Sequence, residues 1–102
     1  MNPRYRLTPN AQENIEAICA FIADDSVDAA LRVLGLLEQA FEQLAETPEI
    51  GHRREDLTNR PVKFWSVFSY LIVYDPASMP LTIIAVLHGA RDVERILQDL
   101  DR

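Results

Sequence analysis

The segment that decides the fold reads Val62-Lys-Phe-Trp-Ser-Val-Phe68, Tyr70-Leu-Ile-Val-Tyr-Asp75 and Leu81-Thr-Ile-Ile-Ala-Val-Leu-His88. These three runs are rich in β-branched and aromatic residues, which favour the pleated, half-buried surface of a sheet. The intervening Pro76-Ala-Ser-Met-Pro80 predicts a hairpin loop, because proline cannot donate a hydrogen bond to a strand ladder. The last two runs are apolar on both faces, so we expect them at the centre of an antiparallel sheet.

The residues near the start of the chain predict a short strand followed by a helix. Charged and apolar residues alternate from Arg4 to Leu7, and Thr8 with Pro9 can cap and begin a helix. The apolar residues that follow recur at helical spacing until Asp24 and Asp25 interrupt the pattern. They are Ala11, Ile15, Ile18, Cys19 and Ile22. One side of this helix is therefore expected to face a core.

A second helix is predicted directly after the first. Ser26 is a suitable N-cap with Asp28 in the first turn, and the helical pattern ends before Thr47 and Pro48. Its apolar stripe consists of Ala30, Leu34, Leu37, Phe41 and Leu44. The two helices should form a hairpin that covers one face of the sheet.

A short amphipathic segment closes the chain from Asp92 onward, and we expect it to be a helix that docks on the sheet or on a partner. Its apolar residues are Val93, Ile96, Leu97 and Leu100. The whole order is β-α-α-β-β-β followed by a helical tail, which defines an α+β fold. A chain of 102 residues supports one core, so residues 1–102 are expected to form a single domain.

Charge and composition argue against several classes of protein. Ten Lys and Arg against 16 Asp and Glu give a formal net charge of −6, whereas proteins that wrap nucleic acid need clustered cations. Most of the acidity lies in the first 50 residues, and the one basic cluster is His52-Arg53-Arg54 with Arg60 and Lys63. The apolar runs are far shorter than a membrane span, and no signal peptide is recognisable. We expect a cytoplasmic protein without membrane contact.

The sequence offers little for cofactor, metal or nucleophilic chemistry. Cys19 has no second cysteine to pair with and lies on a helix stripe, where a thiol is usually a small core hydrophobe. The three glycines are too scattered for a phosphate-binding loop, and two histidines with one cysteine lack the ligand spacing of a metal site. Ser66 and Ser69 have no glycine-flanked turn to expose a nucleophile. We therefore expect no cofactor and no metal.

Four short motifs follow one another along the chain. They are the loop Pro48-Glu-Ile-Gly51, the lead Arg60-Pro-Val62, the strand Tyr70-Leu-Ile-Val-Tyr74 and the closing Val86-Leu-His-Gly-Ala-Arg-Asp92. Together they resemble the ParE branch of the RelE/ParE toxin superfamily over essentially the whole chain. The resemblance implies a small twisted antiparallel sheet with a helical hairpin on one face. It also implies a toxin of a bacterial type II toxin-antitoxin pair, in which ParE-like members poison DNA gyrase and RelE-like members cut mRNA on the ribosome.

Two departures from the RelE-like pattern favour an inhibitor over a nuclease. RNA cleavage needs a general base, a general acid and cations close together. RelE-like nucleases place a tyrosine or histidine shortly after the arginine that matches Arg91, where this chain has the apolar tail residues instead. The remaining proton carriers are His52, His88, Glu55 and Asp56. The acidic balance is the second departure, because binding to ribosomal RNA favours a basic protein.

Three functions therefore remain open. The first is a gyrase-binding ParE-type toxin with no catalytic residues, the second a ribosome-dependent mRNA endonuclease, and the third a non-toxic module that still binds an antitoxin. The expected partner is a cognate antitoxin of the ribbon-helix-helix type, in a hetero-oligomer where only the antitoxin contacts DNA.

Two sets of residues are candidates for these interactions. Tryptophan and arginine are enriched among residues that dominate interfaces, so the basic cluster and the end of the chain are the candidate target-binding surface. This set is Arg53, Arg54, Arg60, Lys63, Trp65, His88 and Arg91. The antitoxin is expected to contact the apolar tail residues Val93, Ile96, Leu97 and Leu100. A groove between the hairpin and the sheet could take an amphipathic helix, and a sheet edge could take a strand.

Overall fold

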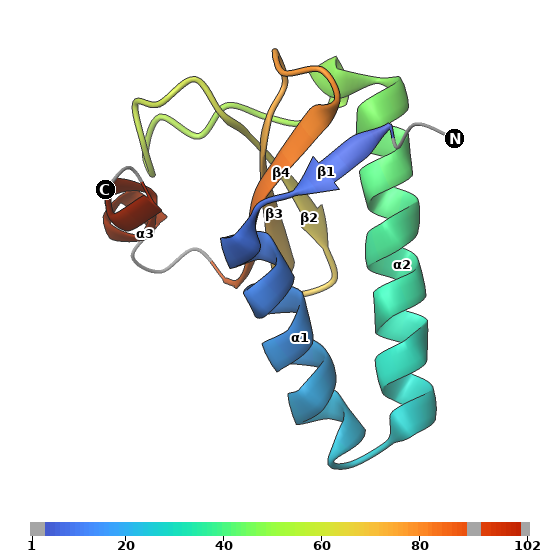
Figure 1. Ribbon diagram of the computed structural model, residues 1–102. Helices are drawn as coiled ribbons and strands as arrows, with labels where there is room; N and C mark the ends of the chain where they lie inside the picture. Colours follow the sequence, from blue (N-terminus) through green and yellow to red (C-terminus); the bar gives the residue numbers. More distant parts are fainter. Residues whose placement is uncertain (1–3, 90–92, 101–102) are drawn as a thin grey trace.

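A computed structural model confirms the α+β fold and its order of elements (Figure 1). The structure describes residues 4–89 and 93–100, with the side chains of all of these except residues 99 and 100. The elements are β1 (Tyr5–Leu7), α1 (Pro9–Ala23), α2 (Val27–Glu46), the 3-10 turn η1 (Pro48–Ile50), β2 (Lys63–Val67), β3 (Tyr70–Asp75), β4 (Leu81–His88) and α3 (Val93–Leu100). Strand β2 is one residue shorter at each end than the predicted strand Val62–Phe68.

Both predicted helix caps are present. The hydroxyl of Thr8 accepts a hydrogen bond from the backbone N–H of Ala11 at 3.1 Å, and that of Ser26 accepts one from Ala29 at 3.1 Å. Each cap satisfies an amide that would otherwise lack a partner in the first turn. The tight turn at residues 24–26 then folds α1 and α2 into the predicted hairpin, which is the longest feature of the molecule in Figure 1.

The strands form one sheet in the order β1-β4-β3-β2. Strands β2, β3 and β4 pair antiparallel, with β3 and β4 at the centre as predicted. The expectation of a wholly antiparallel sheet needs one correction, because β1 pairs parallel to β4 and makes the sheet mixed. A parallel pair requires a long connection, which the hairpin and two strands supply here.

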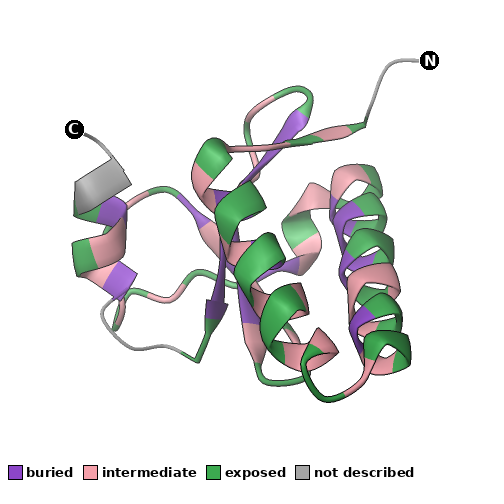
Figure 2. Cartoon of the chain, turned by 60° about the horizontal axis from the view of Figure 1, so that its bottom comes forward, coloured by how far each residue is buried: buried purple, intermediate pink, exposed green. Residues whose placement is uncertain are grey.

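Buried residues form one core on each face of the sheet. The larger core lies under the hairpin and contains Phe41 of α2 with Ile72 and Tyr74 of β3. The second core lies on the opposite face, where Val73 and Leu87 meet the tail helix α3. Figure 2 shows the buried residues of α2 on the side that faces the sheet. The sheet is therefore covered on both faces, by the hairpin on one and by α3 on the other.

The tail helix docks on this chain's own sheet. Val93 and Leu97 are 2% and 3% exposed, and both belong to the second core, with Ile96 packed beside it. Of the two sites expected for the tail, the sheet is therefore the one observed. The predicted starting residue Asp92 and the side chain of Leu100 lie outside the described part of the chain.

Candidate functional site

The predicted target-binding residues are divided among several places rather than gathered in one site. Lys63 and Trp65 lie on the hairpin side of the edge strand β2. The Nζ of Lys63 donates to the carbonyl of Gly51 at 3.3 Å, and the ring of Trp65 stacks on His52 with centroids 6.3 Å apart. His52 itself pairs with Phe64 through the backbone, so this group is tied to the middle of β2.

Arg54 lies in the loop before β2 and is held by a neighbouring carboxylate. Its Nε and Nη2 donate to the two carboxyl oxygens of Asp56 at 3.0 and 2.9 Å. This hydrogen-bonded pair holds the pKa of Asp56 below its usual range and raises that of Arg54. Asp56 is therefore a fixed negative partner of Arg54, and near neutral pH it is a poor proton carrier.

Arg60 belongs to the other face of the sheet. Its Nε lies 3.8 Å from a carboxyl oxygen of Glu94, the second residue of α3, and both side chains are partly covered. The pair joins the loop before β2 to the tail helix. Arg60 therefore helps to position α3, and it lies on the opposite face of the sheet from Trp65. Arg53 is exposed in the loop, and Arg91 lies outside the described residues.

His88 stands at the C-terminal end of β4, where its ring lies 5.4 Å from that of Tyr70 on the neighbouring strand. The two rings belong to a cross-strand pair on the hairpin side of the sheet. They line a hollow of 330 Å³ together with Ala17, Ile18 and Phe21 of α1. Sequence reasoning placed His88 in the candidate surface but missed its aromatic neighbours.

Two exposed aromatic side chains near this end of the sheet were not among the predicted site residues. Phe21 is 81% exposed on α1, and Phe68 is 72% exposed at the turn between β2 and β3. Phe68 also has a φ of 55°, a left-handed conformation that is uncommon for a bulky residue. A signal was available in the sequence, because Ser69 alone separates the predicted strands Val62–Phe68 and Tyr70–Asp75, and no turn-forming glycine or asparagine lies between them.

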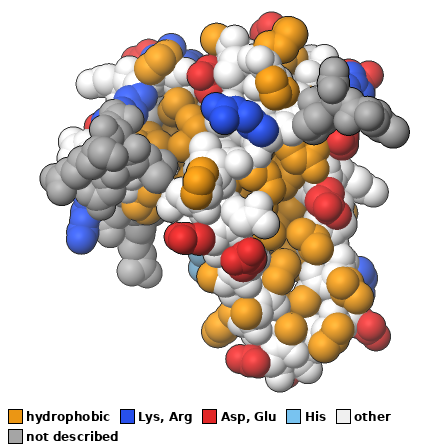
Figure 3. All heavy atoms as spheres, viewed as in Figure 1, with side chains coloured by type: hydrophobic (Ala, Val, Ile, Leu, Met, Phe, Trp, Pro, Cys, Tyr) orange, Lys and Arg blue, Asp and Glu red, His pale blue; other side chains and the backbone are white. Residues whose placement is uncertain are grey.

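The apolar side chains of the hairpin extend beyond the sheet. Figure 3 shows hydrophobic side chains over the lower part of α1 and α2, with acidic side chains among them. The large exposed hydrophobic residues of these two helices are Phe21, Val27, Leu31 and Leu36. Cys19, in contrast, is half-buried against the core as expected, and burial, with a contribution from Glu38, raises the pKa of its thiol.

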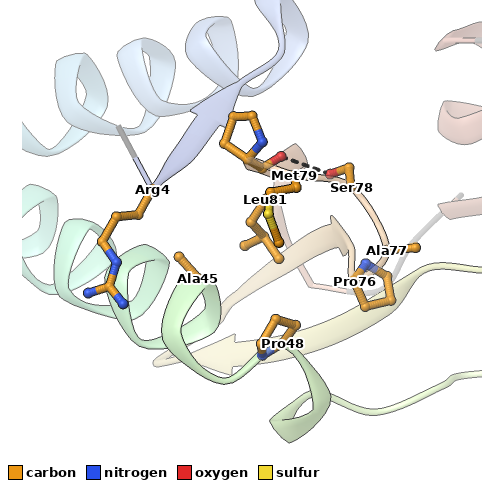
Figure 4. A pocket seen from close by; sticks show the side chains of 9 residues that line it. Arg4, Ala45, Pro48, Pro76, Ala77, Ser78, Met79 and Leu81 are labelled. Carbon is orange, nitrogen blue, oxygen red and sulfur yellow. Dashed lines mark hydrogen bonds between the residues drawn. The ribbon is translucent and has the colours of Figure 1, made fainter. Parts of the chain in front are cut away.

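A hollow that contains none of the predicted site residues lies at the opposite end of the sheet. Its volume is 600 Å³, and Figure 4 shows it between β1, the end of α2 and the β3–β4 loop. The lining is mostly apolar, with Pro48, Pro76 and Pro80 among its residues and Arg4 as the one charged side chain. Ser78 fixes the loop by donating to the hydroxyl of Thr82 at 2.9 Å.

Two further properties bear on function. Within residues 4–89 and 93–100, no three His, Cys, Asp or Glu residues are grouped so as to hold a metal ion. No helix in the described part of the chain combines the length and the apolar character that crossing a bilayer requires.

Comparison with known proteins identifies the family. The sequence model described as "ParE toxin of type II toxin-antitoxin system, parDE" matches residues 5–93, from the start of β1 to the start of α3. The chain belongs to the ParE toxin family. No curated protein matches the sequence. Membership in the ParE family makes this chain a toxin component of a type II toxin-antitoxin system, for which a cognate antitoxin is the partner.

The ParE-like motifs noted in the sequence contact one another in the structure. The hydroxyl of Tyr74 donates to the carbonyl of Pro48 at 2.6 Å and accepts from the backbone N–H of Gly51 at 3.0 Å. The proline-to-glycine loop and the tyrosine strand therefore form one structural unit. At the other end of the same strand, Tyr70 meets His88 of the closing motif. Three of the four ParE motifs are thus joined by contacts towards opposite ends of β3.

Proposed function

We propose that this ParE-family toxin inhibits DNA gyrase by binding to it, without catalysing a reaction of its own. The family establishes a type II toxin and does not by itself separate gyrase inhibition from a RelE-like activity. The proposal therefore depends on where the potential proton carriers lie relative to one another.

The observation that carries the proposal is the separation of the two histidines. His52 pairs with Phe64 on the outer side of the edge strand β2. Phe64 in turn pairs with Val73 of β3, and Val73 pairs with Ala85 of β4. His88 is three residues further along β4. Three strand spacings of about 4.8 Å and three residues of about 3.3 Å put the Cα atoms of the two histidines more than about 15 Å apart. A base and an acid must both reach one phosphate within hydrogen-bond distance, so this backbone separation argues against a cleavage site shared by the two histidines.

The remaining acidic candidates give no better arrangement. Asp56 is engaged by Arg54, and Glu55 is exposed in the same loop. A toxin that acts by binding needs none of these groups, because its effect comes from the complementarity of its surface to the target. Binding is therefore the mechanism that the described side chains support best.

The antitoxin contacts expected on the tail stay a prediction. Because Val93 and Leu97 are buried against the sheet, an antitoxin could reach them only if α3 moves off its docking site. Ile96 is partly exposed and is accessible without such a movement.

The experiment that tests the proposal uses one preparation of the purified chain in two assays. We expect it to inhibit supercoiling of relaxed plasmid by gyrase, to raise the amount of linear, gyrase-bound DNA, and to leave ribosome-bound mRNA intact. The same chain mixed with its cognate antitoxin is the matched control and should lose the effect on gyrase. Codon-positioned cleavage of mRNA with an unaffected gyrase would contradict the proposal and favour the endonuclease.

A further inference from the structure

We propose that the toxin binds its protein target through the end of the sheet formed by Phe21, Phe68, Tyr70 and His88, with Phe68 as the side chain that inserts into the target. We call these four residues the aromatic end. The inference rests on the proposed function, because the partner is the target that the toxin inhibits. It replaces the scattered basic residues with residues that lie together at one end of the sheet.

The backbone at Phe68 is the first argument. Val67 pairs with Tyr70, so Phe68 and Ser69 form a two-residue turn between β2 and β3. Only the first of these has a positive φ, at 55°. Turns of this type favour glycine at that position, because a side chain there is strained. A phenylalanine at this position therefore carries a conformational cost that glycine would avoid.

The exposure of Phe68 is the second argument. The side chain is 72% exposed, so it contributes little to either core. Backbone strain at a residue that does not pack in the core is typical of functional positions. Phe68 and Phe21 together present two large aromatic side chains to solvent, the residue type that supplies most of the energy of protein interfaces.

The four residues lie around one end of the sheet, where two hollows share Tyr70. A hollow of 180 Å³ lies between Phe68, Tyr70 and Arg54. The hollow of 330 Å³ lies on the other side of Tyr70, bordered by His88 and Phe21. Figure 1 places the β2–β3 turn and the end of β4 together at the same end of the sheet, beside α1. The smaller hollow opens beside Ser66 and Leu71 on the α3 face and the larger on the hairpin face, so the aromatic end has a hollow on each face of the sheet.

The chemistry of this surface fits a protein better than a nucleic acid. Arg54, the cation beside Phe68, already donates two hydrogen bonds to Asp56, so the pair is close to neutral. Binding to nucleic acid is driven mainly by cations that meet phosphates, whereas the centre of a protein interface is aromatic and poor in charge. A second copy of the chain is also disfavoured, because α1 and α2 belong to the acidic half and would repel their counterparts.

The test uses Phe68→Gly, a change that removes the ring and also relieves the backbone. We expect the variant to have a melting temperature no lower than that of the wild type and an unchanged affinity for the antitoxin. Its affinity for gyrase should fall about 30-fold, the scale of a dominant interface residue, and growth arrest should be lost with it. Phe21→Ala is a second variant on the same surface and should weaken gyrase binding without altering the turn.

The matched control is Met79→Ala, which removes a 97% exposed hydrophobic side chain from the β3–β4 loop at the opposite end of the sheet. It should bind gyrase as the wild type does. Full gyrase binding by both Phe68→Gly and Phe21→Ala would overturn the inference while leaving the proposed function standing. A wild-type chain that neither arrests growth nor affects gyrase would refute the proposed function and this inference with it. Loss of self-association or of RNA binding in the variants, with gyrase inhibition intact, would also overturn it.

Discussion

Tyr70 and Tyr74 lie four residues apart on β3 and on the same face of the sheet, yet they serve opposite ends of the molecule. Tyr74 is fully buried, and its hydroxyl is bonded to both Pro48 and Gly51. Tyr70 is half-buried between two hollows, against the exposed His88. Tyr74 therefore has a structural role, because the Pro48–Gly51 loop packs on it. Tyr70 is accessible to a binding partner, because none of the described loops packs on it in the same way.

The difference between these two ends comes from the helices rather than from the strand. At the Tyr74 end, α2 is followed by η1, and the two hydrogen-bond partners of Tyr74 are Pro48 of η1 and Gly51 directly after it. At the Tyr70 end, α1 borders a hollow and the turn at Phe68 projects without cover. The first end is therefore expected to be sensitive to changes that disturb packing, and the second to changes that disturb binding.

Gly51→Ala should give the largest effect on stability. A Cβ at this position would lie 2.7 Å from Cε1 of the Tyr74 ring and closer still to its hydroxyl, and the buried ring has no room to move. Gly51 has an extended backbone conformation that alanine can also adopt, so the substitution tests only the steric clash with Tyr74. We expect the free energy of unfolding to fall by about 3 kcal/mol, measured by urea denaturation.

Gly35→Ala is the matched control for that prediction. Gly35 lies inside α2, and an added Cβ there meets no atom within 4 Å. Alanine should therefore stabilise the chain by about 0.5 to 1 kcal/mol through its higher helix propensity. Equal effects of the two substitutions would show that the loop at Gly51 is not packed on Tyr74.

Leu97→Ala should be next in size, at about 2 kcal/mol, because Leu97 is 3% exposed in the core beneath α3. Gln98→Ala, at an exposed position of the same helix, should be nearly neutral. Antitoxin affinity measured on the folded variants then shows whether the proposed antitoxin contact adds to this structural role. A neutral Leu97→Ala would mean that α3 does not dock as described.

Much of this architecture could be predicted from the sequence, and the reasons are local. Thr8 and Ser26 predict the starts of their helices, because an N-cap side chain bonds a backbone amide only three residues away. The apolar runs of β3 and β4 predict central strands because burial on both faces leaves a clear pattern. The parallel pairing of β1 was not predictable, since three residues carry too little pattern to fix a direction.

The candidate site was harder to predict because it depends on which parts of the sheet stay uncovered. Arg54, Arg60 and Lys63 are close in sequence but have different partners in the fold. These partners are Asp56, Glu94 and the Gly51 carbonyl, respectively. Phe21 lies 49 positions before Tyr70 in the sequence and becomes its neighbour only through the fold. Composition drew attention to charge, whereas the structure draws attention to aromatic residues.

Tyr74→Phe should cost about 1.5 kcal/mol, because it leaves the Pro48 carbonyl and the Gly51 amide without their shared partner in a buried place. Tyr70→Phe is the comparison within the same strand. No hydrogen bond of the Tyr70 hydroxyl occurs among the described residues, so its removal should change stability by less than about 0.5 kcal/mol. A larger loss for Tyr70→Phe than for Tyr74→Phe would reverse the proposed division between the two ends.

The smallest effect should appear only at alkaline pH. Burial raises the pKa of Tyr74 above its ordinary value of 10.0, with a contribution from Glu49, and the Gly51 hydrogen bond opposes the shift in part. The folded chain therefore keeps this proton where the unfolded chain releases it. Its stability is complete below pH 9 to 10, roughly the ordinary tyrosine range, and falls as the pH rises through the higher pKa of the folded state. Burial, with contributions from Glu38 and Glu42, also raises the pKa of Tyr5.

We expect the free energy of unfolding to decline between about pH 9 and pH 11 more steeply in the wild type than in Tyr74→Phe. The Tyr5→Phe, Tyr74→Phe double variant should have the flattest profile. Only the slopes are compared, because each variant begins from a different stability at neutral pH. Parallel profiles for all three proteins would show that Tyr74 ionises equally well in the folded and unfolded chains, which its burial between Pro48 and Gly51 does not allow.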